Sequence, residues 1–489
     1  MSTRKLLILT GVFFALLAFV VLWERHQPTS DEAAKARKRL VDLDPKEVSR
    51  LVLERADQAK VELVREGGRW VLAGPKGGAA DAVTADGLAA DLARLDLLGE
   101  TRTEFDPKEH GLAAPRVRVT VTTTDGKART ILFGDPVPGA DATAAAADGR
   151  LGAVRFAPIA QLTKPYDEYR SKSLLDVPTA EIDRLTVVRG PNRVVAVRDG
   201  AGWRLEQPVA DLASGSFVDQ LLADLAGVRA TEFPTVAAAD MPRIGLSPPA
   251  AEVLLAKGRE VLSRLAFGAA KADAAGKLYA SRDGVVMVVD DRAQETLGKE
   301  LSAFREGRLL PLDTWLVTRV VFESESLRAG AEKLDGAWRS AGREVEGRVP
   351  EDLLDRLGRA EVRRFVAAKD LASIGLAPVR RKAPVPAGSV EVLLEKAKAP
   401  VRVAFFSTPP LAAEQLVAAR VDGRGDTLVV DASVWDDVRS FAVRLKAAGA
   451  GGPSAATGGG DARVPPEPRP LARLPALARR GLVLSRPDQ

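Results

Sequence analysis

The clearest pattern of hydrophobic and polar positions in this chain is an alternating apolar run that occurs three times, at domain-sized spacing. Runs rich in β-branched residues, bounded by Gly and Pro, predict strands. In each copy the first strand is followed by a hairpin that ends at a tryptophan. The first strands cover residues 48–53, 185–188 and 316–322, and the hairpins end at Trp70, Trp203 and Trp338.

An amphipathic helix follows each hairpin, with leucines spaced so that they share one face, as at Leu88, Leu92 and Leu95. Beyond the helix comes a second pair of alternating strands. A final strand, residues 278–289 in the second copy, leads into a closing helix. Short turns such as Asp125-Gly126 join neighbouring strands and favour antiparallel pairing.

A short cassette lies between the helix and the second strand pair. It consists of Asp, four residues and then Gly-Leu, and it begins at Asp106, Asp240 and Asp370, every 130 to 134 residues. We expect the aspartate to cap the free amides of a helical turn and the glycine to end that turn in the left-handed conformation. The leucine then enters the core. The recurrence indicates one domain-sized unit copied three times.

The predicted fold class is α+β: three tandem repeats of an antiparallel-sheet-plus-helix unit behind an N-terminal transmembrane helix. Units of this size are each large enough to hold a core. The predicted boundaries are 1–39 for the membrane anchor and stalk, 40–172 for unit 1, 173–308 for unit 2, 309–446 for unit 3, and 447–489 for a disordered tail rich in Ala, Gly and Pro.

The anchor is predicted from residues 6–23, an uncharged run that follows Arg4 and Lys5 and is just long enough to cross a bilayer core of about 30 Å. A cleaved signal peptide is the main alternative, but small residues are missing at its exit, and a buried core helix is the third. We expect a retained single-pass anchor in a bacterial inner membrane, with the bulk of the chain in the periplasm.

The formal net charge of +5 resides at the two ends of the chain. Residues 1–39 carry +4 and residues 447–489 carry +3, which leaves −2 for the body. A nearly neutral body is not a nucleic-acid surface, so nucleic acid is excluded as an expected partner. The absence of cysteine rules out disulfides and thiol catalysis.

No pattern of catalytic, cofactor-binding or metal-ligating residues repeats, and we expect no site of these three kinds. The two histidines are His26 and His110, and His110 occupies the position where the other copies carry Ile244 and Ile374, so it is interpreted as a packing residue. Phosphate-loop and nucleophile-elbow patterns are missing. Two acid pairs, Asp290-Asp291 and Asp436-Asp437, remain as a weak alternative for glycoside chemistry.

Two further motifs have structural interpretations. Arg424-Gly425-Asp426 matches an adhesion tripeptide, but its strand–turn–strand setting is explained by hairpin chemistry. Trp70 and Trp203 are candidate stacking platforms for a sugar, although aromatic residues of strands usually belong to the core.

These features together resemble the domain of unknown function 4340 family, a group of uncharacterised membrane-anchored bacterial proteins. The resemblance covers roughly residues 40 to 446 and is weakest in the third copy, which has Phe405-Phe406 where the others have Phe-Gly. It rests on the anchored start, the Gly-Leu-x-x-Pro step, Gly68-Arg69-Trp70 followed by Pro75, and Phe133-Gly134 recurring as Phe267-Gly268. It implies an association with gliding-type ABC transporters, because family members are often found beside their components.

The leading hypothesis is a non-enzymatic, membrane-anchored envelope protein that is an accessory or scaffold component of an ABC-type transport or gliding-type complex. Its expected partners are the inner membrane, through residues 6–23, and proteins of that complex. The transport association comes from the resemblance alone. The alternative is a periplasmic glycan- or lipid-binding module that uses a cleft between copies, and an enzyme acting through an acid pair is third. The sequence names no small-molecule ligand.

Overall fold

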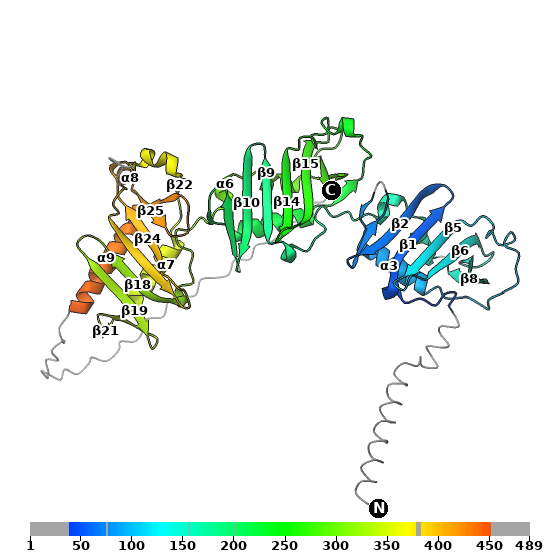
Figure 1. Cartoon of the computed structure of the whole chain (residues 1–489), viewed down its shortest axis with the longest axis horizontal. Helices are drawn as coiled ribbons and strands as arrows, with labels where there is room; N and C mark the ends of the chain where they lie inside the picture. The colour runs from blue at the N-terminus through cyan, green and yellow to red at the C-terminus, as the bar shows by residue number, and fades with distance from the viewer. Residues whose placement is uncertain (1–38, 75–76, 156, 201, 378–382, 451–489) are drawn as a thin grey trace, which may run out of the picture.

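The computed structural model describes residues 39–74, 77–155, 157–200, 202–377 and 383–450, which form three antiparallel sheets in a row along the longest axis (Figure 1). Each sheet lies within one of the three predicted units, so the fold is mostly β with three sheet units. The predicted transmembrane helix lies outside the described residues, as does the chain beyond Ala450. Among the helices that are described, none combines the length and the apolar character needed to cross a bilayer.

The units share a common series of strands around one helix and differ in their short helices, their closing helices and the ninth strand. Unit 1 contains η1 (Pro45–Glu47), β1 (Val48–Arg55), β2 (Gln58–Glu66), β3 (Arg69–Leu72), β4 (Gly78–Ala79), α3 (Ala82–Ala93), β5 (Val117–Thr123), β6 (Ala128–Pro136), β7 (Ala142–Ala147), β8 (Arg150–Arg155), η2 (Ala157–Thr163) and η3 (Tyr166–Tyr169). Unit 2 contains η4 (Thr179–Glu181), β9 (Arg184–Arg189), β10 (Asn192–Asp199), β11 (Gly202–Gln207), β12 (Asp211–Leu212), α4 (Gly215–Gly227), β13 (Ala230–Glu232), η5 (Ala238–Asp240), β14 (Ala251–Lys257), β15 (Glu260–Ala270), β16 (Lys277–Arg282), β17 (Val285–Asp290), α5 (Arg292–Leu297) and α6 (Leu301–Phe304). Unit 3 contains η6 (Thr314–Leu316), β18 (Val317–Glu323), β19 (Arg328–Leu334), β20 (Ala337–Ser340), β21 (Arg343–Glu344), α7 (Arg348–Arg359), β22 (Arg364–Val366), η7 (Ala368–Ile374), β23 (Gly388–Leu394), β24 (Val401–Phe406), α8 (Pro409–Ala413), β25 (Leu416–Val421), β26 (Thr427–Asp431) and α9 (Ala432–Ala450).

The three sheets share one topology. Their strand orders are β4-β3-β2-β1-β5-β6-β7-β8, β12-β11-β10-β9-β14-β15-β16-β17-β13 and β21-β20-β19-β18-β23-β24-β25-β26-β22. Unit 1 lacks the ninth strand, but the same edge carries two isolated bridges, Leu97 with Val154 and Arg102 with Leu151. The shared order of the first eight strands confirms that the chain consists of repeated sheet units.

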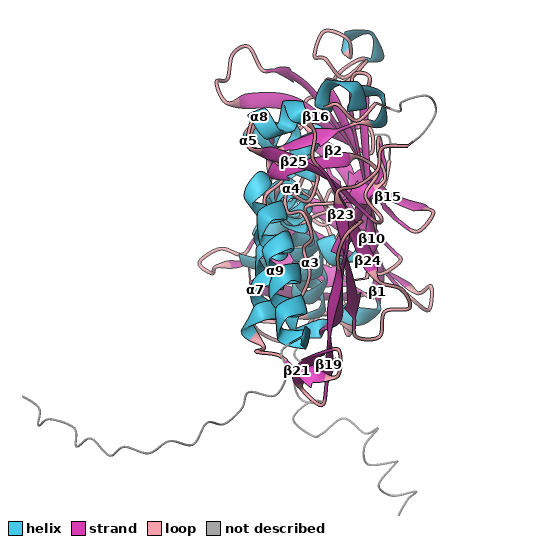
Figure 2. Ribbon diagram, turned by 90° about the vertical axis from the view of Figure 1, so that its left-hand side faces the viewer, coloured by secondary structure: helices cyan, strands magenta, loops and turns pink. Residues whose placement is uncertain are grey.

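Helices cover one face of the sheets, and in the side view the helices of all three units lie on the same side of the strands (Figure 2). The leucines of α3, α4 and α7 are buried in the cores of their units, as their spacing predicted. The opposite sheet face carries cross-strand ion pairs, such as Arg50 with Glu62 at 2.7 Å. Antiparallel sheets commonly have one packed and one solvated face, and this chain follows that rule.

The cassette ends as expected in all three units. Gly111, Gly245 and Gly375 have φ values of 68°, 68° and 73°, the left-handed region that glycine enters without a Cβ penalty. In units 1 and 2 the carbonyl before the glycine then packs on the Phe-Gly step of the neighbouring strand. In unit 2 the Ala269 amide donates to the Ile244 carbonyl at 2.8 Å, and a Cβ on Gly268 would lie 2.4 Å from that oxygen. The Phe-Gly step is therefore required by close approach of two backbone segments.

The cap expected of the cassette aspartate forms in one unit only. Asp106 accepts a hydrogen bond from the Lys108 amide at 2.9 Å. In the other two units the short helix begins earlier, so that Asp240 is its last residue and Asp370 lies inside it. An aspartate within the turn does not face the free amides at its start, which is why the capping prediction is wrong there.

The final strand predicted at residues 278–289 is also corrected. It is a hairpin of β16 and β17, joined by Asp283 and Gly284, which have φ values of 50° and 86°. Positive φ at both central residues is the type I′ geometry that an Asp-Gly pair favours.

We expect Gly268→Ala to destabilise the chain by about 1–3 kcal/mol, because the new methyl group collides with the Ile244 carbonyl and must displace backbone. Gly227→Ala is the matched control, since Gly227 lies in α4 with no neighbouring atom within 4 Å. That change should raise stability by about 0.5 kcal/mol. Urea unfolding of both variants measures the difference, and equal effects would refute the close-approach explanation.

Candidate functional site

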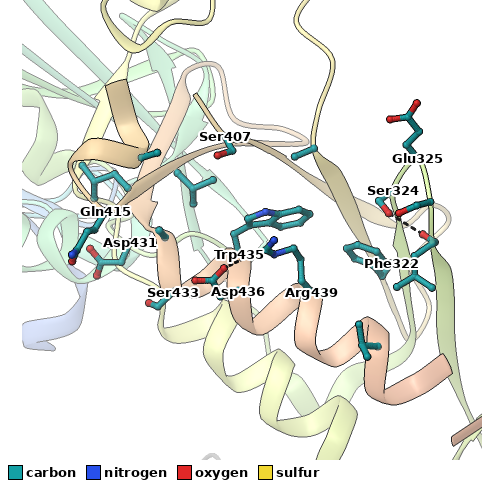
Figure 3. A pocket seen from close by; sticks show the side chains of 18 of the residues that line it. Phe322, Ser324, Glu325, Ser407, Gln415, Asp431, Ser433, Trp435, Asp436 and Arg439 are labelled. Atoms are coloured by element: carbon teal, nitrogen blue, oxygen red, sulfur yellow. Dashed lines mark hydrogen bonds and ion pairs between the residues drawn. The ribbon is translucent and has the colours of Figure 1, made fainter. Parts of the chain in front are cut away.

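A groove in unit 3 lies beside α9 and has a volume of about 1100 Å³ (Figure 3). Trp435 and Arg439 rise from α9 into it, and Ser324, Ser407 and Gln415 are among the polar residues of its wall. The Trp435 side chain stacks on the Phe405 ring at 5.1 Å between centroids, and Trp435 is only 8% exposed. A ring that is covered in this way holds the core of unit 3 together and presents no open face to a sugar.

The two carboxylates of the acid pair Asp436-Asp437 line different grooves. Asp436 lines the groove of Figure 3 and pairs with Arg439, whereas Asp437 lines a neighbouring groove and pairs with Arg356 at 3.1 Å. Successive residues of a helix point about 100° apart, so the two carboxylates do not face one reaction centre. The other acid pair sits where β17 ends, with Asp291 as the N-cap residue of α5.

The strongest concentration of buried polar side chains lies where one unit passes into the next. The segment that leads into each unit pairs with the chain just after that unit's helix. The amides of Leu40, Leu174 and Leu309 donate to the carbonyls of Leu95, Val228 and Ala360 at 2.9, 3.0 and 2.7 Å. All three leading leucines are fully buried.

In each unit one arginine donates hydrogen bonds to backbone carbonyls of the leading segment. This arginine lies at the turn between β7 and β8 in unit 1, between β16 and β17 in unit 2, and between β25 and β26 in unit 3. Arg150 donates to the Leu40 carbonyl. Arg282 donates to the carbonyls of Ser171 and Ser173, and Arg424 to those of Glu306, Arg308 and Leu309. Buried carbonyls need donors, and one guanidinium supplies several in a fixed fork. The arginine therefore fixes the path of the chain between units.

The second joint, between units 2 and 3, adds a buried ion cluster. Asp211 is fully buried and accepts from two arginines, from Arg424 Nε at 2.6 Å and from Arg305 Nε at 2.6 Å. Arg305 also pairs with Asp426 at 2.7 Å. The cluster joins the β12 end of unit 2 to the β25/β26 turn of unit 3. Two positive and two negative groups balance, which buried charges require.

Packing around this cluster is equally close. The Arg305 guanidinium lies 3.8 Å from the centre of the Phe365 ring. The Gly425 amide donates to the Ala210 carbonyl at 2.7 Å, and a Cβ on Gly425 would lie 2.6 Å from a methyl carbon of Val209. Units 2 and 3 therefore meet through close contacts around a buried centre made of Asp211, Arg305 and Arg424.

The first joint, between units 1 and 2, has the same backbone plan but different side chains. Arg170 takes the place of Arg305 and lies 5.3 Å from the Phe233 ring. Strand register places Gly78 where the second joint has Asp211, and Val285 where it has Asp426. Both carboxylates of the second joint are thus replaced, and a cavity of about 650 Å³ opens beside Arg170 and Val285.

Charge at the first joint is balanced locally, by acids close to each arginine in the chain. Arg170 Nε donates to Asp167 at 2.9 Å. Burial lowers the pKa of the Arg282 guanidinium, the nearby Asp176 and Asp283 act to raise it, and Arg170 acts to lower it. The two arginines are therefore close enough to repel one another, and no carboxylate is placed between them by Gly78 or Val285.

The other residues named in the sequence analysis lie in packing or core positions where the structure describes them. His110 is half-buried and meets the Phe105 ring edge-on at 6.5 Å, as a packing residue does. Trp70 and Trp203 are 3% and 4% exposed, which confirms that they belong to the core. His26 lies outside the described residues. Within those residues, no group of three or more His, Cys, Asp or Glu side chains is arranged to hold a metal ion.

Arg424-Gly425-Asp426 is a turn, as predicted, but sequence reasoning missed that Arg424 is buried at the second joint. Its partner Asp211 is 213 positions away, a separation that no local pattern reveals. The linker arginines, Arg170 and Arg305, did share a recognisable sequence pattern. Each follows an aromatic residue, as in Tyr169-Arg170 and Phe304-Arg305, and is separated by three residues from a Leu-Leu pair.

Comparison with protein families agrees with this architecture of repeated sheet units. The model of the domain of unknown function DUF4340 matches residues 70–214 and 203–378. The two matches begin at equivalent tryptophans, one period apart, and together cover more than half of the chain. The chain therefore belongs to the DUF4340 family. No curated protein and no solved structure matches it.

We expect Asp211→Asn to reduce the free energy of unfolding by about 3 kcal/mol or more, because it leaves two buried arginines without their shared carboxylate. Asp355→Asn removes an exposed pair with Arg359 in α7 and is the matched control, with an expected loss below about 0.5 kcal/mol. Guanidinium unfolding compares the two. A similar small loss in both variants would show that the cluster does not hold the joint.

Proposed function

We propose that this protein is a non-enzymatic scaffold or accessory component of an envelope transport complex, anchored in the inner membrane of a bacterium with its sheet units in the periplasm. The observation that supports this most directly is the second joint. A cross-unit ion pair that is fully buried, Asp211 with Arg424, holds two sheet units as one extended body. Proteins that position partners need such a fixed spacing between surfaces.

The use of the buried charges supports the same proposal. The most deeply buried ionic groups, Asp211, Arg305 and Arg424, contact each other and backbone carbonyls between units. Such contacts supply connection between units and give no group positioned for proton transfer or nucleophilic attack on a substrate. The link to an ABC-type transporter comes from the family resemblance and is analogy.

A glycan- or lipid-binding module is the second candidate. Trp70 and Trp203, the candidate stacking platforms for a sugar, are buried in the core and do not form a binding surface. The observation that favours this candidate is a different one, the cavity at the first joint, which lies between copies of the unit.

The scaffold proposal predicts that a tagged full-length chain, extracted from its native membrane in mild detergent, carries permease subunits of an ABC transporter with it. Mass spectrometry of the eluate measures their enrichment over an unrelated single-span protein with the same tag. Asp211→Asn, which loosens the body formed by units 2 and 3, should reduce the enrichment severalfold. An eluate without transporter components, compared with that control, would contradict the proposal.

The proposed periplasmic location of the sheet units predicts the outcome of a thiol-labelling experiment. Because the natural chain has no cysteine, Val261→Cys introduces a single thiol, at a β15 position that is 55% exposed. A membrane-impermeant maleimide should label it in cells whose outer membrane alone is permeabilised. Leu255→Cys, at a fully buried position, should stay unlabelled until the protein is denatured. Labelling of Val261→Cys only after lysis would place the units in the cytoplasm instead.

A further inference from the structure

The two joints provide an internal comparison, because the chain crosses both by the same backbone path. At the first joint the Ser171 amide donates to the Ala79 carbonyl of unit 1 at 2.9 Å. The next carbonyl, that of Lys172, accepts from the Ala230 amide of unit 2 at 2.6 Å. The chain therefore passes from one unit to the next between neighbouring residues, and a change of backbone angles at this single step turns one unit against the other.

The second joint is crossed in the same way at Glu306 and Gly307. The Glu306 amide donates to the Leu212 carbonyl at 2.9 Å, and the Gly307 carbonyl accepts from the Val362 amide at 2.7 Å. Glycine restricts the backbone less than any other residue. The crossing itself is thus at least as free to bend at the second joint as at the first, so a difference in rigidity must come from contacts between the units.

Contacts across the second joint are buried and approach from several directions. Asp211 of unit 2 accepts from Arg424 of unit 3 at 2.6 Å, and both side chains are fully buried. The amide that follows Arg424 donates to the Ala210 carbonyl at 2.7 Å, and Arg305 pairs with Asp426 at 2.7 Å. Turning unit 3 against unit 2 would separate buried charges from their partners, which is strongly unfavourable.

Contacts across the first joint are weaker. Arg69 of unit 1 pairs with Glu181 of unit 2 at 3.5 Å, and the two side chains are 52% and 40% exposed. An exposed pair of this kind contributes little and is screened by salt. Arg170 lies 5.3 Å from the Phe233 ring of unit 2, while its charge is met by Asp167 of its own unit. Unit 1 can therefore turn without leaving a buried charge unpaired across the joint.

A cavity of about 650 Å³ lies between units 1 and 2. Its wall comes from both units and includes the charged residues Lys60, Glu62, Asp167 and Arg170 beside apolar residues such as Phe233. A space with several polar groups suits water, and water yields to a change of shape where close packing does not. Relative motion is the default expectation for domains whose interface is not large and apolar.

We propose that the first joint is a hinge, at which unit 1 turns relative to a single rigid body formed by units 2 and 3. Ser171 and Lys172 absorb the change of backbone angles, and the cavity widens or narrows with it. The cluster around Asp211 keeps the second joint fixed. The hinge goes beyond the scaffold role and does not depend on the identity of any partner.

Double electron–electron resonance on the full-length chain tests the hinge, because a chain without cysteine accepts spin labels at chosen positions. Val83→Cys with Val261→Cys spans the first joint, and Val261→Cys with Leu334→Cys spans the second, at positions that are 83%, 55% and 43% exposed. Leu334→Cys with Val443→Cys lies within unit 3 and gives the width due to the labels alone. We expect the distance distribution across the first joint to be about twofold broader or more, and that across the second to match the width within unit 3.

A variant of the second joint tests the cause of the difference. Asp211→Asn should broaden the distribution across that joint about twofold, because the buried arginines lose their shared carboxylate. Asp355→Asn, which removes an exposed pair within α7, is the matched control and should leave the width unchanged. Circular dichroism establishes whether Asp211→Asn is folded. If it is not, Asp426→Asn takes its place, since it removes the pair with Arg305 and leaves Asp211 intact.

Three results would overturn the proposal: equal widths across the two joints, a first joint that is narrower than the second, or an unchanged width at the second joint in the folded variant. Co-purification of transporter subunits is a separate measurement. Failure of the hinge and failure of the scaffold role are therefore distinguished.

Discussion

The architecture depends on one interaction, the hydrogen bonds from a turn arginine to the carbonyls of the segment that leads into each unit. Arg150, Arg282 and Arg424 make these bonds in units 1, 2 and 3. The leading segment passes from one core to the next, and its carbonyls are buried without a strand partner on that side. Orphaned buried carbonyls are costly, and a guanidinium satisfies several from a single side chain. Units 2 and 3 therefore each follow the previous unit through a short segment whose carbonyls are hydrogen-bonded.

Burying an arginine creates a second requirement, a negative charge nearby. The second joint meets it with Asp211 and Asp426, which belong to different units. The first joint meets it with Asp167, three residues from Arg170 in the chain. A carboxylate from across the joint fixes the relative position of two units, whereas a local one neutralises charge without doing so. Buried ion pairs contribute little net stability, but they penalise any arrangement that separates them.

The repeat itself was readable from the sequence because its markers are dictated by backbone conformation. Gly111, Gly245 and Gly375 hold left-handed positions that other residues enter at a cost, so the residue type marks the turn in every copy. The core tryptophans were likewise readable from strand alternation. The Asp283-Gly284 pair is a hairpin signal inside the segment predicted as one long strand. Local chemistry thus determined most of what could be predicted.

The joints were beyond prediction because they depend on pairs that are distant in sequence. Asp211 and Arg424 have ordinary neighbours, and only the folded chain shows that both are buried together. An Arg-Gly-Asp turn is normally a solvated hairpin, and nothing local distinguishes one that fits against Val209 and Ala210. The linker arginines do repeat, yet repetition alone does not say whether their partner is an acid, a carbonyl or a ring.

Copying a unit preserves the backbone that builds a joint and leaves the side chains within it free to change. The second joint retains Asp211, while the first has Gly78 at the same register position. In the first joint, acids of the same unit lie beside each arginine, Asp167 beside Arg170, and Asp176 and Asp283 beside Arg282. The first joint therefore keeps the backbone path of the second while its charge is balanced within each unit, a difference that arises in the side chains without any change of fold.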